Sequence, residues 1–427
     1  MNGLPPLKQA YVLLDGHNIC EIGHQQDIAN NPPDIAICKL QSSVCLPGFI
    51  NCHTHLAYPR YYQAVSSQGQ IDWIDGLVKH SRHLSQLEKR QIAGANVKRC
   101  LQGGTTLLVE NTPFRETIEA LANSPLKAVI AWEVFGNSAE GAESVFSQSI
   151  HSINSLEAEF QDKAFHFTLS PHSVYNVGAS LLKKLTDWAV RYHKPLFIHL
   201  SEFDFELELT HNGFPNQALS SFHRSFRQGK PDLDNLSSLS PVEYLHRLNC
   251  LHHNLVATHL VKASRKDFQL LHEAQVKVIS CPRSNLYLHN GVPPFHLMRE
   301  EGLPIAFATD GLSSNFDLSL LNEIKTAWFL SQACGGDLKA SDCFEGITSV
   351  AAKHLNLQAL VGSLEAGKRA DLLCFRLQKD DANDIMETLK DEALYFFLLS
   401  EMTDNQLSHV FVDGKEVLHT LSDKPVK

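Results

Sequence analysis

The sequence predicts an α/β fold, a (β/α)8 TIM-type barrel with a small β-sandwich formed by the N- and C-terminal segments. Between residues 44 and 311, short apolar runs of β type alternate with stretches of helical periodicity. Both ends of the chain instead contain short β-like pieces separated by turn residues. Buried strands that alternate with helices are typical of a parallel barrel. An open doubly wound sheet is the alternative, but no Gly-x-Gly-x-x-Gly motif follows an early strand.

Eight segments are expected to be the barrel strands, because each is an apolar run that ends in polar residues. Helices are expected between them, for example at 180–193 and 264–275. The expected strands are 44–55, 105–111, 127–135, 165–173, 195–202, 255–261, 276–285 and 304–311.

The two ends of the chain are expected to pair into one small sandwich. An Asp-Gly pair at 413–414 is a typical hairpin turn. The predicted domains are a composite sandwich of residues 1–46 and 359–427, and a barrel of residues 47–358. The polar segment 211–240 is expected to be a loop or lid after the fifth strand.

Composition and charge narrow the possible partners and the compartment. The formal net charge is −10 and no Lys/Arg cluster stands out, which disfavours a nucleic-acid or anionic-membrane partner. No apolar stretch approaches the roughly 18 residues of a membrane span, and the N-terminus lacks signal-peptide features. The 10 cysteines include no C-x-x-C pair and are expected to be free thiols. We therefore expect a cytoplasmic protein that acts on a small molecule, and a homo-oligomer stays open.

Polar residues at the ends of the expected strands are the candidate functional groups. His53 and His55 end the first strand and, at a spacing of two, point to the same side of it. Strand-end histidines are usually structural when taken singly, and an Asp-Gly pair is usually a turn. Several groups from five strands would nevertheless meet at one barrel rim. The other candidates are His172, His199, Glu202, His259 and Asp310.

This set of side chains suits a metal ion. Three neutral imidazoles and one carboxylate fit Zn²⁺ or Fe²⁺, with water in an open position. Glu202 and His259 would then remain free to handle protons.

The chain resembles the amidohydrolase superfamily over nearly its whole length. The resemblance is carried by four motifs: His-x-His in GFINCHTH, the His of FIHLSE, the His of ATHLV and the Asp of FATDG. The fourth strand carries SPHSVYN and no lysine that could bridge two metals, so the sequence resembles the mononuclear deaminase branch. The resemblance implies one divalent metal, zinc with iron as the alternative. Its ligands would be His53, His55, His199 and Asp310.

Two longer stretches, SCPRSNLYL and FATDGLSSNFDLSLLNEIKTA, resemble aminodeoxyfutalosine deaminases of the alternative menaquinone route. The SPHSVY motif is shared with S-adenosylhomocysteine and methylthioadenosine deaminases, in which its histidine contacts the substrate. The resemblance implies the same role for His172. The sequence departs from the futalosine group at Ala57, where an acidic residue is expected, and at Phe203, where a serine is expected.

The resemblance implies hydrolytic deamination of a 6-aminopurine nucleoside, with aminodeoxyfutalosine first and guanine, triazine, adenosine, methylthioadenosine or S-adenosylhomocysteine as alternatives. Zinc lowers the pKa of its water from about 16 to about 7. Asp310 would take the proton from that water, and Glu202 would pass a proton to the ring nitrogen. His259 would hold the attacking oxygen.

Arg283, in the CPRSN motif, has two possible roles. It could pair with a substrate carboxylate, or it could brace the loop after the seventh strand. The alternative from a different functional class is a barrel that has lost catalysis and serves as a scaffold or binding module. Barrels of that kind usually lose metal ligands, whereas all the expected ligands are present here.

Overall fold

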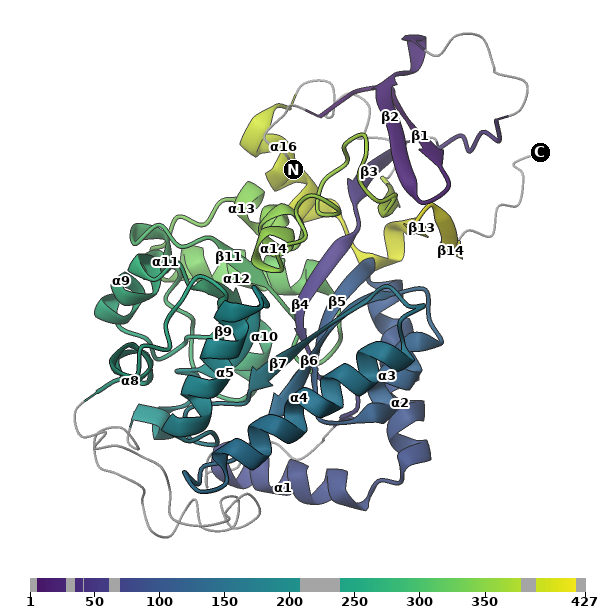
Figure 1. The fold of residues 1–427 in the computed structure, drawn as a ribbon. Coiled ribbons are helices and arrows are strands. Elements are labelled where there is room, and N and C mark those ends of the chain that lie inside the picture. Colours follow the sequence, from purple (N-terminus) through teal and green to yellow (C-terminus); the bar gives the residue numbers. More distant parts are fainter. Residues whose placement is uncertain are drawn as a thin grey trace.

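The computed structural model describes residues 6–27, 35–40, 42–60, 70–207, 239–377 and 389–419. Eight parallel strands lie side by side in chain order and curve into a nearly closed barrel (Figure 1). The strands are β4 (Phe49–Thr54), β5 (Thr105–Thr112), β6 (Lys127–Val134), β7 (Phe165–Pro171), β8 (Leu196–Leu200), β9 (Leu255–His259), β10 (Lys277–Ser280) and β11 (Ile305–Phe307). The predicted barrel is confirmed.

The first and last barrel strands are held together by hydrogen bonds. The Asn51 side-chain amide donates to Thr309 Oγ1 over 2.7 Å, and the Thr309 backbone N–H donates to Asn51 Oδ1 over 3.1 Å. The Asp310 backbone N–H also donates to the His53 carbonyl. These bonds bring the ends of β4 and β11 to one rim, where a site of this fold is built.

Helices surround the barrel and follow the strands, as the alternating pattern predicts (Figure 1). The expected helix at 180–193 is α5 and the one at 264–275 is α9. Ser264 caps the start of α9 with a reciprocal bond to Asp267. The helices are α1 (Gln70–His83), α2 (Gln86–Gln102), α3 (Arg115–Ala122), α4 (Ala142–Glu159), α5 (Ala179–Arg191), α8 (Pro241–Arg247), α9 (Arg265–Glu273), α10 (Pro282–Tyr287), α11 (Phe295–Glu300), α12 (Leu320–Ala333), α13 (Ala340–Gly346), α14 (Ser349–His354) and α16 (Asp391–Glu401).

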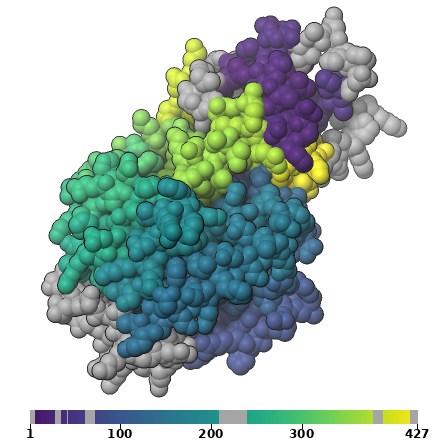
Figure 2. Space-filling view, viewed as in Figure 1, coloured from purple at the N-terminus to yellow at the C-terminus, as the bar shows by residue number. Residues whose placement is uncertain are grey.

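The terminal segments form an antiparallel sheet beside the barrel. Strand β3 (Ser43–Pro47) pairs with β12 (Leu372–Arg376), followed by β13 (Leu407–Val412) and β14 (Lys415–His419). A hairpin of β1 (Ala10–Asp15) and β2 (Asn18–His24) packs near it through Ile19. Figure 2 shows these N- and C-terminal segments together at one end of the molecule.

The predicted first strand, 44–55, is wrong as a single element. It divides into β3 of the terminal sheet and β4 of the barrel. The division falls at Gly48, whose backbone N–H donates to the Asp371 carbonyl. A Cβ at Gly48 would lie 2.1 Å from Thr106 Oγ1, so the chain can pass from one sheet to the other here only without a side chain.

Replacing Gly48 by alanine is expected to lower the free energy of unfolding by about 1–3 kcal/mol, because the added methyl overpacks against Thr106. Chemical denaturation of the purified protein measures the change. Gly94→Ala is the matched control, since a Cβ at this α2 position meets no atom within 4 Å. Alanine is also the better helix former, so the control is expected to be neutral or stabilising. Equal destabilisation by both changes would contradict this account.

Two expectations fall partly or wholly outside what the structure describes. Of the predicted lid 211–240, only residues 239 and 240 are described. The domain boundaries at 46/47 and 358/359 stay predictions. Among the described residues, every helix is too short or too polar to cross a membrane.

Candidate metal centre and active site

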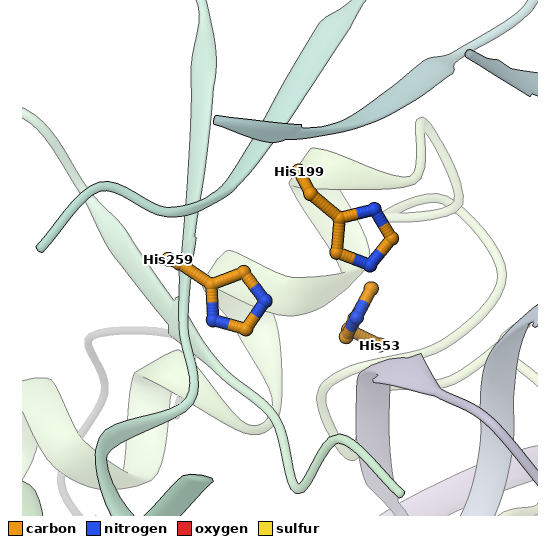
Figure 3. Close-up of side chains that lie close together, drawn as sticks. All are labelled: His53, His199 and His259. Carbon is orange, nitrogen blue, oxygen red and sulfur yellow. The ribbon is translucent and has the colours of Figure 1, made fainter. Parts of the chain in front are cut away.

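Four histidines and an aspartate meet at the C-terminal rim of the barrel. His53 is in β4, and His55 is the first residue after that strand. His199 is in β8, and His259 ends β9. Asp310 follows β11 and is 7% exposed. In Figure 3 the imidazole rings of His53, His199 and His259 gather around one point, although they come from three different strands.

The distances within this group suit a shared cation. His55 Nε2 lies 3.2 Å from His199 Nε2. His53 Nε2 and His55 Nε2 each lie 3.7 Å from Asp310 Oδ1. The sets His53–His199–His259 and His53–His55–Asp310 each place their ligand atoms within 4.8 Å of one another. These sets include all four residues expected to hold the metal, and they add His259.

The polar atoms of this group are poorly satisfied by protein alone. His53 Nε2 is buried and has no hydrogen-bond partner among the described residues. Such a buried atom costs about 1–3 kcal/mol. Two Nε2 atoms at 3.2 Å would also repel each other if both presented lone pairs. A divalent cation resolves both problems, so these residues fit the metal that the sequence predicts.

Two of the histidines, His53 and His199, are held in the neutral form that a metal requires. Burial, followed by the nearby His55, holds the pKa of His53 well below its usual value. Burial and the adjacent His172 have the same effect on the pKa of His199. Burial alone would raise the pKa of Asp310, but the surrounding histidines, His55 and His53 first, lower it to about 2.

A second layer of contacts orients these side chains. His199 Nδ1 lies 2.8 Å from the His172 carbonyl and can donate to it, which leaves Nε2 free. His53 Nδ1 lies 2.9 Å from the Asn111 amide. The hydroxyls of Ser284 and Ser314 donate to Asp310 Oδ2 over 2.6 and 2.7 Å. Partners of this kind fix the tautomer and direction of metal ligands.

Glu202 lies beside the cluster in a buried position. Its Oε2 is 3.7 Å from His259 Nε2, and Asn290 donates to its Oε1 over 3.2 Å. Burial, with the carboxylates of Asp310 and Glu206, holds the pKa of Glu202 well above its usual value. His259 Nδ1 in turn lies 2.9 Å from Asn285 Oδ1.

The backbone at this rim is strained where the side chains are positioned. His259 and Asp310 have φ values of +79° and +57°, and Ser201, just before Glu202, has +50°. Left-handed backbone is uncommon for residues other than glycine and clusters at functional sites. The turn after β8 is held by Glu206, whose carboxylate accepts the backbone N–H groups of residues 201–203.

A cavity of about 320 Å³ opens over the cluster, at the small end of the range for small-molecule sites. Its lining combines the polar groups of the cluster with aromatic and aliphatic side chains. Its lining is His55, Tyr58, Trp73, Ile74, Leu77, Val78, Ser81, Arg82, Lys89, Pro113, Phe114, Glu133, Phe135, His172, Tyr175, His199, Glu202, Phe203, His259, Leu288, Asp310, Ser313 and Ser314.

Comparison with known proteins agrees with this geometry. A sequence model of the amidohydrolase family matches residues 44–417, which is most of the chain. The chain belongs to the amidohydrolase family.

Relatives of this amidohydrolase include two named deaminases. A 5-methylthioadenosine/S-adenosylhomocysteine deaminase of Thermodesulfovibrio yellowstonii is 26% identical over 418 residues, covering 95% of this chain and 87% of the relative. An aminodeoxyfutalosine deaminase of Nitratiruptor is 26% identical over 392 residues, covering 92% and 91%. An adenosine deaminase of Xanthomonas campestris with bound zinc has a TM-score of 0.77 at 20% identity, covering 97% and 89%, and shows the shared fold.

The structure of this amidohydrolase brings most of the predicted site residues together. His55, His172, His199, Glu202, His259 and Asp310 line one cavity, and His53 lies next to His55 with ring centroids 4.8 Å apart. His172 stacks on His199 at 4.7 Å, and burial lowers its pKa to about 3. The assignment of ligand, proton-transfer and substrate-contact roles among these residues stays a prediction.

Arg283 does not join this group, and its predicted pairing with substrate stays a prediction. It is absent from the cavity lining, and its guanidinium forms a two-point ion pair with Asp317, with one N–O distance of 3.0 Å. Its backbone N–H donates to Glu323. Arg283 lies in the first turn of α10. There its charge is paired with Asp317, from the loop before α12, and its backbone N–H with Glu323 of α12. The geometry matches the alternative role of bracing the loop.

Sequence reasoning missed Glu133, which lines the cavity and ends the third barrel strand. Its Oε1 is buried without a partner among the described residues, and burial raises its pKa to about 7. Its carboxylate lies within 4.8 Å of ligand atoms of His55 and His199. The rule that found the other residues, a polar group at a strand end, would also have found this one.

Proposed function

We propose that this amidohydrolase is a metal-dependent hydrolytic deaminase, which converts a 6-aminopurine nucleoside and water to the 6-oxo nucleoside and ammonia. The observation that carries the proposal is the placement of a buried carboxyl group, Glu202, in the same cavity as the convergent His/Asp cluster. The two deaminases among the relatives support it.

His53, His55, His199 and Asp310 would hold one divalent ion, zinc with iron as the alternative. Imidazole and carboxylate ligands suit both metals. The chemistry that the ion supplies when bound is Lewis acidity, which makes water nucleophilic at neutral pH.

The proton transfers fall to the side chains around the ion. Glu202, whose pKa is raised by burial and by the carboxylates of Asp310 and Glu206, would donate a proton to the ring nitrogen beside the carbon under attack. Asp310, ionised because its pKa is lowered, accepts the proton of the attacking water. His259 donates from Nδ1 to Asn285 Oδ1, so its neutral ring presents Nε2 as an acceptor and would hold the attacking water by a hydrogen bond. The proton held by Asp310 then leaves with the amino group as ammonia. The remaining hydroxyl proton passes to Glu202 as the C–N bond breaks and the carbonyl forms, which restores both carboxyl groups and leaves the ring nitrogen protonated in the 6-oxo product.

The cavity walls suit a flat aromatic ring. Phe135 lies 4.9 Å from His172 between ring centroids, and Tyr175 lies 5.9 Å from it. These rings contact one another in the cavity lining, and an aromatic side chain that lines a cavity can stack on a nucleobase. Phe203, at the position where a serine was expected, adds an apolar wall, and Ala57 is buried outside the lining. His172 is proposed to contact the purine.

The proposed substrate is 6-amino-6-deoxyfutalosine, which would give futalosine in menaquinone biosynthesis. The alternatives are S-adenosylhomocysteine, methylthioadenosine and adenosine, all of which present the same aminopurine to the metal.

Ammonia release from zinc-loaded protein separates these possibilities. The panel is aminodeoxyfutalosine, adenosine, methylthioadenosine, S-adenosylhomocysteine and guanine. We expect kcat/KM above about 10⁴ M⁻¹s⁻¹ for the true nucleoside, as for typical enzymes. Consumption of guanine alone would place the protein among other hydrolases of the family. No ammonia from any member, with one equivalent of metal bound, would overturn the proposal.

A further inference from the structure

The cavity has a second end, formed by the last turn of α1 and the first turn of α2, which contribute none of the metal-cluster residues. Phe114 and Tyr58 lie between this end and the cluster: their ring centroids are 5.8 Å apart, and Tyr58 lies 6.1 Å from His55. Ser81 and Arg82 of α1 and Lys89 of α2 line it. Lys89 Nζ lies 4.5 Å from the centroid of the Phe114 ring, which is also part of the lining. Two cationic side chains from different helices therefore border the same cavity.

These cations differ from their neighbours on the same helices. Lys79 of α1 is paired with Asp75 at 2.6 Å, and Arg90 of α2 is paired with Glu119 at 3.1 Å. Arg82 and Lys89 have no acidic partner within the described ranges. The acids of the cavity, Glu133, Glu202 and Asp310, belong to its metal end. The cavity is therefore polarised, with acids and metal ligands at one end and unpaired cations at the other.

The surface between the two ends is apolar. Trp73, Leu77 and Val78 of α1 pack with Leu288 in one apolar cluster, and all four line the cavity together with Phe114. A ligand that reaches both ends needs an aminopurine at the metal, an apolar spacer in the middle and an anion at the far end.

We propose that Arg82 and Lys89 bind a carboxylate at the end of the substrate's 5′ substituent, so that the substrate is an aminopurine nucleoside with an anionic, apolar-linked 5′ extension. This inference rests on the proposed deaminase function. Arginine suits a carboxylate because its guanidinium offers two parallel donors, and lysine adds a point charge. The apolar middle disfavours a phosphate bonded directly to the 5′ carbon. Arg82 and Lys89 would thus pair with the substrate carboxylate, which is one of the two roles predicted for Arg283.

The test compares two substrates that differ only in charge, aminodeoxyfutalosine and its methyl ester, with wild-type protein and an Arg82→Gln/Lys89→Gln double variant. For the acid, the double variant is expected to raise KM by at least about 10-fold, because hydrogen bonds to charged groups are worth that much. Its kcat should stay within about threefold, since uniform binding is what is lost. For the ester, KM should be nearly unchanged.

A Lys79→Gln/Arg90→Gln double variant is the matched control. It removes the same number of positive charges from the same two helices, but at positions paired outside the cavity. It is expected to leave the KM of both substrates unchanged. An equal rise in KM for acid and ester, or the same rise in the control, would overturn the carboxylate site. Stronger competition by adenosine 5′-monophosphate than by the acid would overturn it in favour of a phosphate site.

A binding measurement keeps this inference separate from the deaminase proposal. Titration calorimetry with futalosine, the 6-oxo product, needs no turnover. If wild-type protein releases no ammonia but binds futalosine more tightly than the Arg82/Lys89 variant does, the deaminase proposal fails and the carboxylate site stands. If ammonia is released and both proteins bind futalosine equally, the carboxylate site fails alone.

Discussion

Replacing Glu202 by glutamine is expected to lower the rate of ammonia release by about 10²–10⁴-fold, the usual contribution of a general acid–base group. Glutamine keeps the shape of the side chain and can still accept the hydrogen bond from Asn290. It cannot give up a proton to the ring nitrogen. The loss should therefore appear in kcat and kcat/KM together.

Metal content and thermal stability separate this loss from damage to the fold. Both are expected to stay at wild-type values, because Glu202 is outside the proposed ligand set and the change removes a buried ionisable group. Asp204→Asn is the control. Asp204 lies two residues further on, but its carboxylate is exposed and paired with Lys262, so its activity should be unchanged. A Glu202→Gln protein with more than about half of wild-type activity would rule out the proton-transfer role.

Replacing His199 by alanine is expected to weaken metal binding by more than about 100-fold, since loss of an outer-shell partner alone costs 10–100-fold. His199 lies 3.2 Å from His55, and its rotamer is held by the carbonyl of His172. Activity should fall in parallel with bound metal. Elemental analysis of purified protein and competition with a chelator measure the change.

The melting temperature gives an independent measure of the same site. A metal at 100 times its Kd stabilises the native state by about 2.7 kcal/mol, so chelation should lower the melting temperature of wild-type protein and change that of the His199→Ala variant little. His151→Ala is the control, because His151 is exposed on α4, away from the cluster. Full metal content and full activity in the His199→Ala protein would remove His199 from the ligand set.

The barrel could be predicted from the sequence because each strand carries a local signal. Strands β5 and β6 are buried on both faces, so their sequences are continuous apolar runs. Such a run predicts a buried strand without knowledge of the strand it pairs with. The error at 44–55 has a tertiary cause. The run is apolar throughout, but its first half pairs with β12, more than 300 positions later in the chain, and only the crowding around Gly48 shows where the sheets change.

The site could be predicted where residue type and strand position coincide. His53, His199 and Asp310 are strand-end residues, and the parallel arrangement of the strands brings such ends to one rim. Arg283 follows the seventh strand but is absent from the cavity lining. Its sequence position resembles that of a substrate contact, but Asp317 and Glu323 satisfy its charge in the folded chain.

The sequence by itself determined the barrel, the clustering of its strand-end histidines and acids, and therefore the candidate metal chemistry. Only the tertiary structure decided which cations meet the cavity, because Arg82 and Lys89 lie on helices whose packing no local pattern specifies. Strand ends converge through hydrogen-bonded pairing, which is regular and can be read from a sequence. Whether a helix side chain reaches a cavity depends on the angle at which its helix packs. It also depends on which acidic groups are already paired with neighbouring cations. Both are properties of the whole fold.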